Sequence, residues 1–124
     1  MELILGGAYQ GKRDFARTAY GVEHFFTCNE SSLDIDYSAP AIDRLEEFCL
    51  ACVRAGKDPV KLFETHREAW QSSVLICRDI FCGVVPLGAE TREWRQVTGQ
   101  FCRYLSKNAQ HVTRIFCGLP QTLK

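Results

Sequence analysis

The chain has 124 residues, with 15 basic and 15 acidic side chains and a formal net charge of zero at pH 7. This balance gives no electrostatic footprint for nucleic acid, and no apolar run approaches the ~20 residues that a membrane span needs. We therefore expect one globular domain, residues 1–124, with no nucleic-acid partner and no membrane span.

A short apolar run, Glu2–Leu5, leads directly into the segment GGAYQGKR at residues 6–13. The run predicts a buried strand, and Lys12–Tyr20 predicts a helix that ends at Gly21. The spacing between them is G-x-x-x-x-G-K, the pattern of a phosphate-binding loop. Its glycines let backbone N–H groups face a phosphate, while the lysine and the helix N-terminus add positive charge. The alternative is an ordinary glycine turn with a solvated lysine.

Position 13 departs from this motif. A serine or threonine normally follows the lysine, and its hydroxyl ligates the Mg²⁺ that bridges the outer phosphates. Arg13 has no acceptor atom, although its guanidinium can contact phosphate directly. We therefore expect the loop to bind phosphate, with Mg²⁺ weakly placed or absent.

Strands and helices alternate along the rest of the chain. The pattern predicts a strand at Glu23–Cys28, a loop at 29–39, a helix from Pro40 to Gly56, a helix capped by Asp58, a strand at Ser73–Arg78, a loop at 79–88, a helix at Glu90–Asn108, a last strand at His111–Cys117 and a short tail. Such alternation is typical of parallel sheets. The predicted fold is therefore α/β and P-loop NTPase-like, a mainly parallel sheet of about four strands flanked by helices. Ligands of such folds bind at the carboxyl ends of the strands, where Gly6, Cys28 and Asp79 lie.

Seven cysteines stand at positions 28, 49, 52, 77, 82, 102 and 117. The odd number, the apolar neighbours and the lack of a recognisable export signal favour free, buried thiols in the reducing cytoplasm. Cys49 and Cys52 form a C-x-x-C pair, which leaves a redox or metal protein as an alternative. That pair has no second pair and no histidine at ligand spacing, whereas a closed zinc site needs four ligands.

Three segments resemble one known family. LILGGAYQGKRDFA resembles the start of the adenosylcobinamide kinase / adenosylcobinamide-phosphate guanylyltransferase family, whose loop runs G-G-x-x-S-G-K-S. VLICRDIFCGVVPLGAETREWRQVTGQFCRYL resembles its strand with N-E-V-G-x-G-I-V-P and its helix with F-R-D-x-x-G-R-x-N. VTRIFCGLPQTLK resembles its closing V-x-G-[IL]-P-x-x-[IL]-K. The resemblance covers residues 1–30 and 73–124, and it implies a role in cobalamin biosynthesis.

The resemblance also implies a set of site residues and partners. Lys12 and Asp79 are the candidate catalytic residues, and Asp79 is also the candidate metal ligand. Adenosylcobinamide is implied as the substrate that receives a phosphate from ATP or GTP, and a homo-oligomer is expected. The candidate nucleotide-binding residues are Gly6, Gly7, Ala8, Tyr9, Gln10, Gly11, Lys12, Arg13, Cys28, Asn29 and Arg95.

The middle of the chain departs from the family. A histidine that takes up GMP covalently and a later acidic strand are expected between Cys28 and Ser73, where the pattern predicts only a loop and two helices. None of His24, His66 and His111 stands at the position of that histidine. Without this nucleophile, guanylyl transfer lacks its covalent carrier. The alternative function is therefore a non-catalytic relative that binds nucleotide or corrinoid, or that assembles with an active enzyme.

Overall fold

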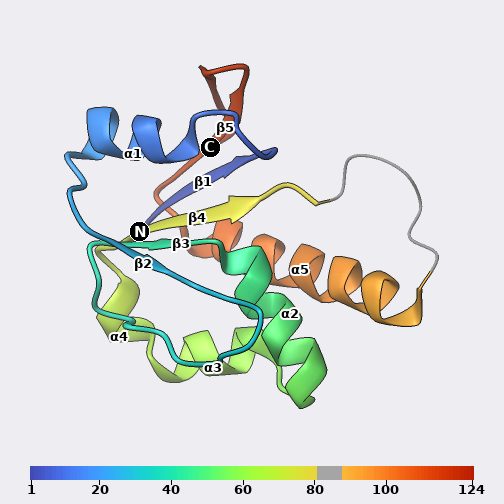
Figure 1. Ribbon diagram of the computed structural model, residues 1–124. Coiled ribbons are helices and arrows are strands. Elements are labelled where there is room, and N and C mark those ends of the chain that lie inside the picture. The colour runs from blue at the N-terminus through green and yellow to red at the C-terminus, as the bar shows by residue number, and fades with distance from the viewer. Residues whose placement is uncertain (81–87) are drawn as a thin grey trace.

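A six-stranded sheet organises the part of the chain that the computed structural model describes, residues 1–80 and 88–124 (Figure 1). The strand order is β2-β3-β4-β1-β5-β6. The first five strands of this order run parallel, and β6 pairs with β5 in the antiparallel direction. The bounds are β1 Glu2–Gly6, β2 Phe25–Thr27, β3 Ala41–Asp43, β4 Val74–Arg78, β5 His111–Phe116 and β6 Leu119–Thr122.

The first strand, β1, lies at the centre of the sheet between β4 and β5, as its apolar sequence predicts. Successive side chains point to opposite faces of a strand. Leu3 accordingly packs into one core and Ile4 into the other, and both are almost fully buried. A strand that buries both faces has the continuous apolar character seen at Glu2–Leu5.

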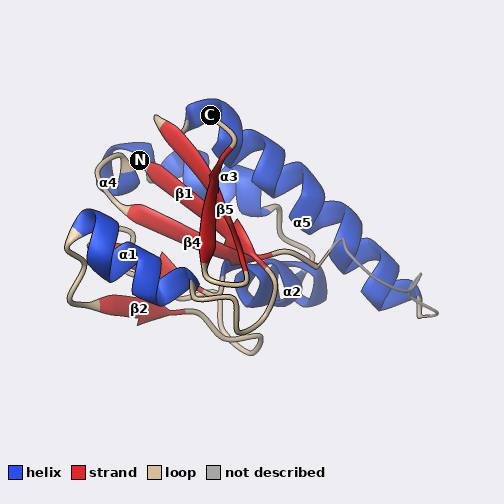
Figure 2. Cartoon of the chain, turned by 90° about the horizontal axis from the view of Figure 1, so that it is seen from above, coloured by secondary structure: helices blue, strands red, loops and turns tan. Residues whose placement is uncertain are grey.

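Helices cover both faces of the sheet, but unequally (Figures 1 and 2). The first helix, α1 (Lys12–Tyr20), covers one face and buries Ala16 with Ile4 and Ile76. The other face carries the larger core, in which Phe48, Phe63 and Phe101 lie against one another. The helices on that face are α2 (Leu45–Ala55), α3 (Pro59–Thr65), α4 (Arg67–Trp70) and α5 (Ala89–Asn108).

Several predicted helix boundaries are confirmed. The first helix covers Lys12–Tyr20 as expected and ends at Gly21, whose φ of 65° is a left-handed cap. The N-cap of α3 is Asp58, whose Oδ1 accepts the Val60 N–H at 2.9 Å, and Pro59 fills the first turn. The long helix begins one residue before the predicted Glu90.

The sheet has six strands where about four were predicted, because two short strands carry weak local signals. The segment after Pro40 was predicted as helix, yet Ala41–Asp43 forms β3, and α2 begins only at Leu45. The Pro40 carbonyl accepts the Val74 N–H at 3.0 Å, and Ala41 and Ile42 are fully buried. Proline has no backbone N–H, and the start of a strand is a position where the ladder does not require one. The prediction of only a loop and two helices between Cys28 and Ser73 is therefore wrong.

The predicted C-terminal tail instead folds back as β6. Cys117 and Gly118 both have positive φ, at 51° and 76°. Two successive residues with positive φ form the tight turn that matches the twist of a two-stranded hairpin. The register pairs Phe116 with Leu119. The short sequence of this edge strand, LPQT, carries no apolar alternation that would reveal it.

The predicted burial of Cys49, Cys52, Cys77 and Cys102 is confirmed, and all four are free thiols. Cys82 and most of the predicted loop at 79–88 lie outside the described residues. Within the described ranges, none of the helices combines the length and apolar character that crossing a bilayer requires.

Candidate functional site

The loop at residues 6–13 joins the central strand to α1, so the motif stands in the strand-loop-helix context that it requires. Two of its glycines are demanded by geometry. A Cβ on Gly6 would lie 2.7 Å from the carbonyl oxygen of Ile115 on β5, closer than real Cβ atoms approach. Gly11 caps α1 with a φ of 93°, which other residues rarely adopt. The glycine pattern therefore follows from close packing at one end of the loop and from backbone conformation at the other.

Hydrogen bonds fold the loop back over its own lysine. The Lys12 ammonium donates to the Gly7 carbonyl at 2.6 Å, which closes a ring across the loop. The turn after β5 holds the opposite side, because the Gly118 N–H donates to the Gln10 carbonyl at 3.1 Å and the Cys117 N–H donates to the Gln10 side chain. The Lys12 side chain and the turn after β5 therefore hold the loop together.

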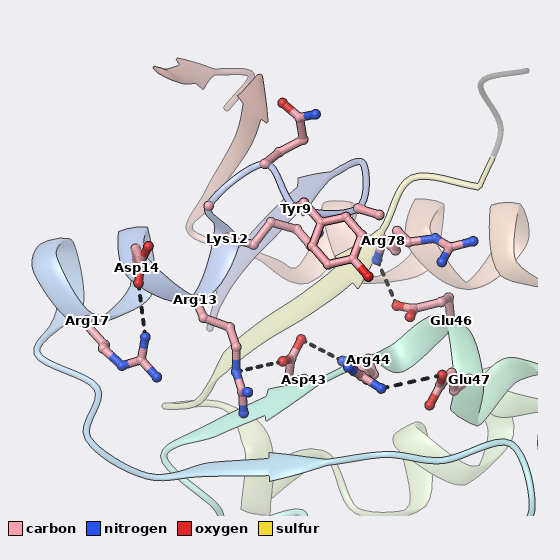
Figure 3. A pocket seen from close by; sticks show the side chains of 13 residues that line it. Tyr9, Lys12, Arg13, Asp14, Arg17, Asp43, Arg44, Glu46, Glu47 and Arg78 are labelled. Carbon is pink, nitrogen blue, oxygen red and sulfur yellow. Dashed lines mark hydrogen bonds and ion pairs between the residues drawn. The ribbon is translucent and has the colours of Figure 1, made fainter. Parts of the chain in front are cut away.

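Beside the loop lies an open cavity of about 750 Å³ at the carboxyl edge of the sheet (Figure 3). The loop and α1 form one side, and the junction of β3 with α2 forms the other, with five basic and four acidic side chains in total. Its volume is typical of small-molecule pockets. The described lining residues are Ala8, Tyr9, Gln10, Gly11, Lys12, Arg13, Asp14, Arg17, Asp43, Arg44, Glu46, Glu47 and Arg78.

Arg13 crosses from α1 to the end of β3. Its Nε lies 2.9 Å from Asp43 Oδ2, a second guanidinium nitrogen donates to Thr27 Oγ1 at 3.2 Å, and the guanidinium lies 4.5 Å from the centre of the Phe25 ring. Asp43 is 5% exposed, and its other oxygen accepts the Arg44 N–H at 2.7 Å. N–H donors therefore engage both oxygens of this buried carboxylate.

Glu46, in the first turn of α2, is the second buried acid of the cavity. Its Oε1 accepts the Arg78 N–H at 2.8 Å, and its backbone carbonyl accepts from the Trp94 indole at 2.7 Å. Burial raises the pKa of the Glu46 carboxyl, and the bond from Arg78 opposes that shift. Burial also lowers the pKa of Lys12, while the carboxylates of Glu46 and Asp43 act in the opposite direction. The cavity thus holds charges that its own burial disfavours, as binding sites for charged ligands often do.

The structure brings together most of the predicted loop residues. Ala8 through Arg13 line the cavity, with Tyr9 fully exposed at a φ of 59°. The N–H of Asp79 donates to the Gly6 carbonyl at 2.7 Å, so this residue begins the segment beside the loop. Asp79 itself and Arg95 on α5 are not among the described lining residues.

Cys28 and Asn29 follow β2, next to the end of β3. The buried Cys28 donates its N–H to the Asp43 carbonyl at 3.0 Å, and burial raises the pKa of its thiol. Asn29 instead uses Oδ1 to accept the Ser31 N–H at 2.8 Å, which is a local turn contact. Neither residue is among the described lining residues.

The three histidines lie elsewhere, and none is among the described lining residues. His66 stacks on Tyr37 and bonds through Nδ1 to the Leu62 carbonyl. His111 pairs with Glu2 at the opposite edge of the sheet, and His24 precedes β2. The predicted site for His24 within a strand is therefore wrong by one residue.

Sequence reasoning missed Asp43 and Glu46. The available signal is the short apolar run Ala41-Ile42, which ends in Asp43 just as other parallel strands end in polar residues. Pro40 in front of it resembles a helix start, and the run is too short to show a period.

The described residues contain no group of three or more His, Cys, Asp or Glu side chains arranged to hold a metal ion. No protein-family model and no curated protein matches this chain.

Proposed function

We propose that this chain binds the phosphate groups of ATP or GTP in the cavity beside the loop at residues 6–13. The observation that carries the proposal is the loop itself, held between the central strand and α1 with Lys12 folded onto the Gly7 carbonyl at 2.6 Å. A phosphate oxygen bound there would accept the hydrogen bond that the Lys12 ammonium now donates to that carbonyl. The start of α1 lines the same cavity, and the first N–H groups and the positive dipole end of a helix favour an anion.

The non-catalytic form of this function is favoured. Phosphoryl transfer depends on positioning and charge stabilisation, in which Mg²⁺ has a central part. The carboxylate of Asp43 is engaged by Arg13 at 2.9 Å, so the cavity lacks an acid ready to receive a cation from that side. We therefore propose that the chain is a nucleotide-binding relative of the adenosylcobinamide kinase / guanylyltransferase family, and the sequence resemblance implies a role in cobalamin biosynthesis. Its proposed location is the cytoplasm, and its proposed assembly is a homo-oligomer.

A second candidate function is phosphate transfer from the bound nucleotide to adenosylcobinamide. The hydrogen bond from the Asp79 N–H to the Gly6 carbonyl favours it, because it sets this residue beside the start of the loop. In this scheme Lys12 holds the phosphates and Asp79 positions the substrate hydroxyl. Phosphorylated adenosylcobinamide, measured by chromatography after incubation with ATP, separates the two candidates.

Calorimetric titration of the protein with ATP and with GTP tests the binding proposal. Replacing Lys12→Gln removes the charged donor to the phosphates and is expected to weaken affinity by at least about tenfold. The matched control is Lys61→Gln, an exposed lysine on α3 whose loss should leave affinity unchanged. Unmodified protein that binds neither nucleotide, with or without Mg²⁺, would overturn the proposal.

A further inference from the structure

Arg13, the residue after the loop lysine, contacts Asp43 at the end of β3, the second strand from β1 in the sheet. In phosphate-loop proteins a hydroxyl at this sequence position and an aspartate together hold the Mg²⁺ of the bound nucleotide. In this chain the residue after the loop lysine is Arg13, and the acid that it meets is Asp43, with 2.9 Å between Nε and Oδ2 (Figure 3).

These residues do not fit a magnesium ion. Mg²⁺ requires oxygen ligands in near-octahedral geometry at roughly 2.0–2.1 Å. Arg13 supplies no acceptor, and Asp43 already accepts N–H donors on both oxygens, from Arg13 and from the Arg44 backbone at 2.7 Å. Admitting the ion would break the contact with Arg13 and bring two cations together beside one carboxylate.

The arginine is also fixed in this position. Its guanidinium bonds to Thr27 Oγ1 at 3.2 Å and lies over the Phe25 ring, both on β2. Its partner Asp43 has a side chain that is 7% exposed, whereas the Arg13 side chain is 44% exposed. The pair thus has a buried acid as its anchor and a cation with one side open toward the cavity. Cation–π and hydrogen-bond contacts of this kind orient a guanidinium without consuming its charge.

The other acids of the cavity are likewise engaged. Glu47 lies 3.8 Å from Arg44, Asp14 lies 3.1 Å from Arg17, and Glu46 accepts from the backbone of Arg78. Lys12 adds a further cation where the phosphates enter. The described lining thus holds five basic and four acidic side chains, and each of the four acids already has a donor beside it.

We infer that the Arg13–Asp43 ion pair replaces the metal ion at this loop, so that the cavity binds the metal-free triphosphate in preference to its magnesium complex. This inference rests on the proposed nucleotide function and adds the ionic form of the ligand. An arginine contacts phosphate oxygens through its N–H groups at no cost in metal dehydration. The magnesium complex presents a hydrated dication to Arg13 and is disfavoured by like charge.

The test is calorimetric titration of the unmodified protein with ATP in excess EDTA and in excess Mg²⁺. We expect tighter binding in EDTA, by on the order of threefold to tenfold, because Mg²⁺ removes the charge that Arg13 recognises. Tighter binding in Mg²⁺ would overturn the inference and leave the nucleotide function standing. The absence of binding in both buffers would overturn the nucleotide function, and this inference with it.

Variants of Arg13 and Asp43 test the part that each residue plays. Arg13→Ser should reverse the preference, with affinity in EDTA falling about tenfold and Mg²⁺ restoring it through Asp43. Arg13→Ser combined with Asp43→Asn should lose that response to Mg²⁺, and a response that persists would overturn the role of Asp43. Arg103→Ser, on the exposed face of α5, is the matched control and should keep the preference of the unmodified protein. Arg13→Lys keeps the charge without the planar fork, so it tests the site if the serine variant fails to fold.

Discussion

The two ends of the central strand β1 carry charged clusters of different character. At the carboxyl end, Asp43 and Glu46 are each 5% exposed, and each accepts from N–H donors of neighbouring elements. At the amino end, Glu2 accepts from the Tyr20 hydroxyl at 3.3 Å and lies 2.9 Å from Nδ1 of His111, whose side chain is 62% exposed. The second cluster borders a smaller cavity of about 430 Å³.

The difference shows that the carboxyl end of β1 depends on ordered polar contacts more than the amino end does. A buried charge without a partner is costly, so the partners at the carboxyl edge must be positioned by the fold. At the amino edge His111 is exposed to water while Glu2 is partly buried, so that pair depends less on such support. The loop glycines and the two buried acids converge on the carboxyl end of β1.

The largest expected effect comes from Gly6→Ala at the carboxyl end of β1. The added Cβ would lie 2.7 Å from a backbone oxygen of β5, so the loop or the strand must move. We expect a loss of about 3 kcal/mol in the free energy of unfolding, measured by urea denaturation. Gly7→Ala is the matched control, since its Cβ meets only a side-chain atom at 3.6 Å. Equal effects of the two substitutions would contradict this account of the first glycine.

Asp43→Asn and His111→Ala compare the side-chain pairs at the two edges. The first leaves Arg13 without its carboxylate, and we expect a loss of about 1–2 kcal/mol in unfolding free energy, below the range for fully buried pairs because water reaches the freed guanidinium. The second removes the exposed partner of Glu2 and should cost less than about 0.5 kcal/mol. The same denaturation measurement serves both. A larger loss for His111→Ala would reverse the comparison.

The smallest expected effect is a pH-dependent one at Glu46. Burial raises the pKa of its carboxyl in the folded state, so the folded chain holds this proton over a pH range in which the unfolded chain has released it. The contribution of Glu46 to stability is thus greatest below its unfolded pKa and is lost as the pH rises through the folded value. Glu46→Gln should stabilise the protein at neutral pH.

That gain should shrink as the pH falls toward 4.5, the usual pKa of a glutamate. Thermal unfolding of the variant and the unmodified protein across this range measures it. Glu93→Gln on the exposed side of α5 controls for the loss of one acid anywhere on the molecule. If the gain in stability stays the same across this pH range, the effect is not linked to this proton.

The elements with strong local sequence patterns were predicted correctly. Glu2–Leu5 is long enough to show a buried strand, Lys12–Tyr20 is bounded by glycines, and Asp58-Pro59 has the chemistry of a helix start. The parallel direction of the first five strands followed from the alternation of strands and helices. The loop position also followed, because G-x-x-x-x-G-K lies between a strand and a helix.

The two short strands and the buried acids depended on contacts between distant segments. Ala41–Asp43 becomes a strand because β2 and β4 on either side provide backbone partners, which no three-residue window reveals. Leu119–Thr122 pairs with β5 only after the chain turns at Cys117 and Gly118.

The amino-acid sequence by itself determined the loop, the helix behind it and the arginine that replaces the usual hydroxyl. These depend on residue type and on spacing within about one helical turn, where backbone preference and sterics act directly. Only the tertiary structure decided what Arg13 contacts. Its partner Asp43 lies 30 positions away and reaches it because β1, which leads into the loop and α1, runs parallel to β3 in the same sheet, so that both strands end at the same edge. Long-range pairing of charges follows from strand order, which the packing of the whole sheet sets.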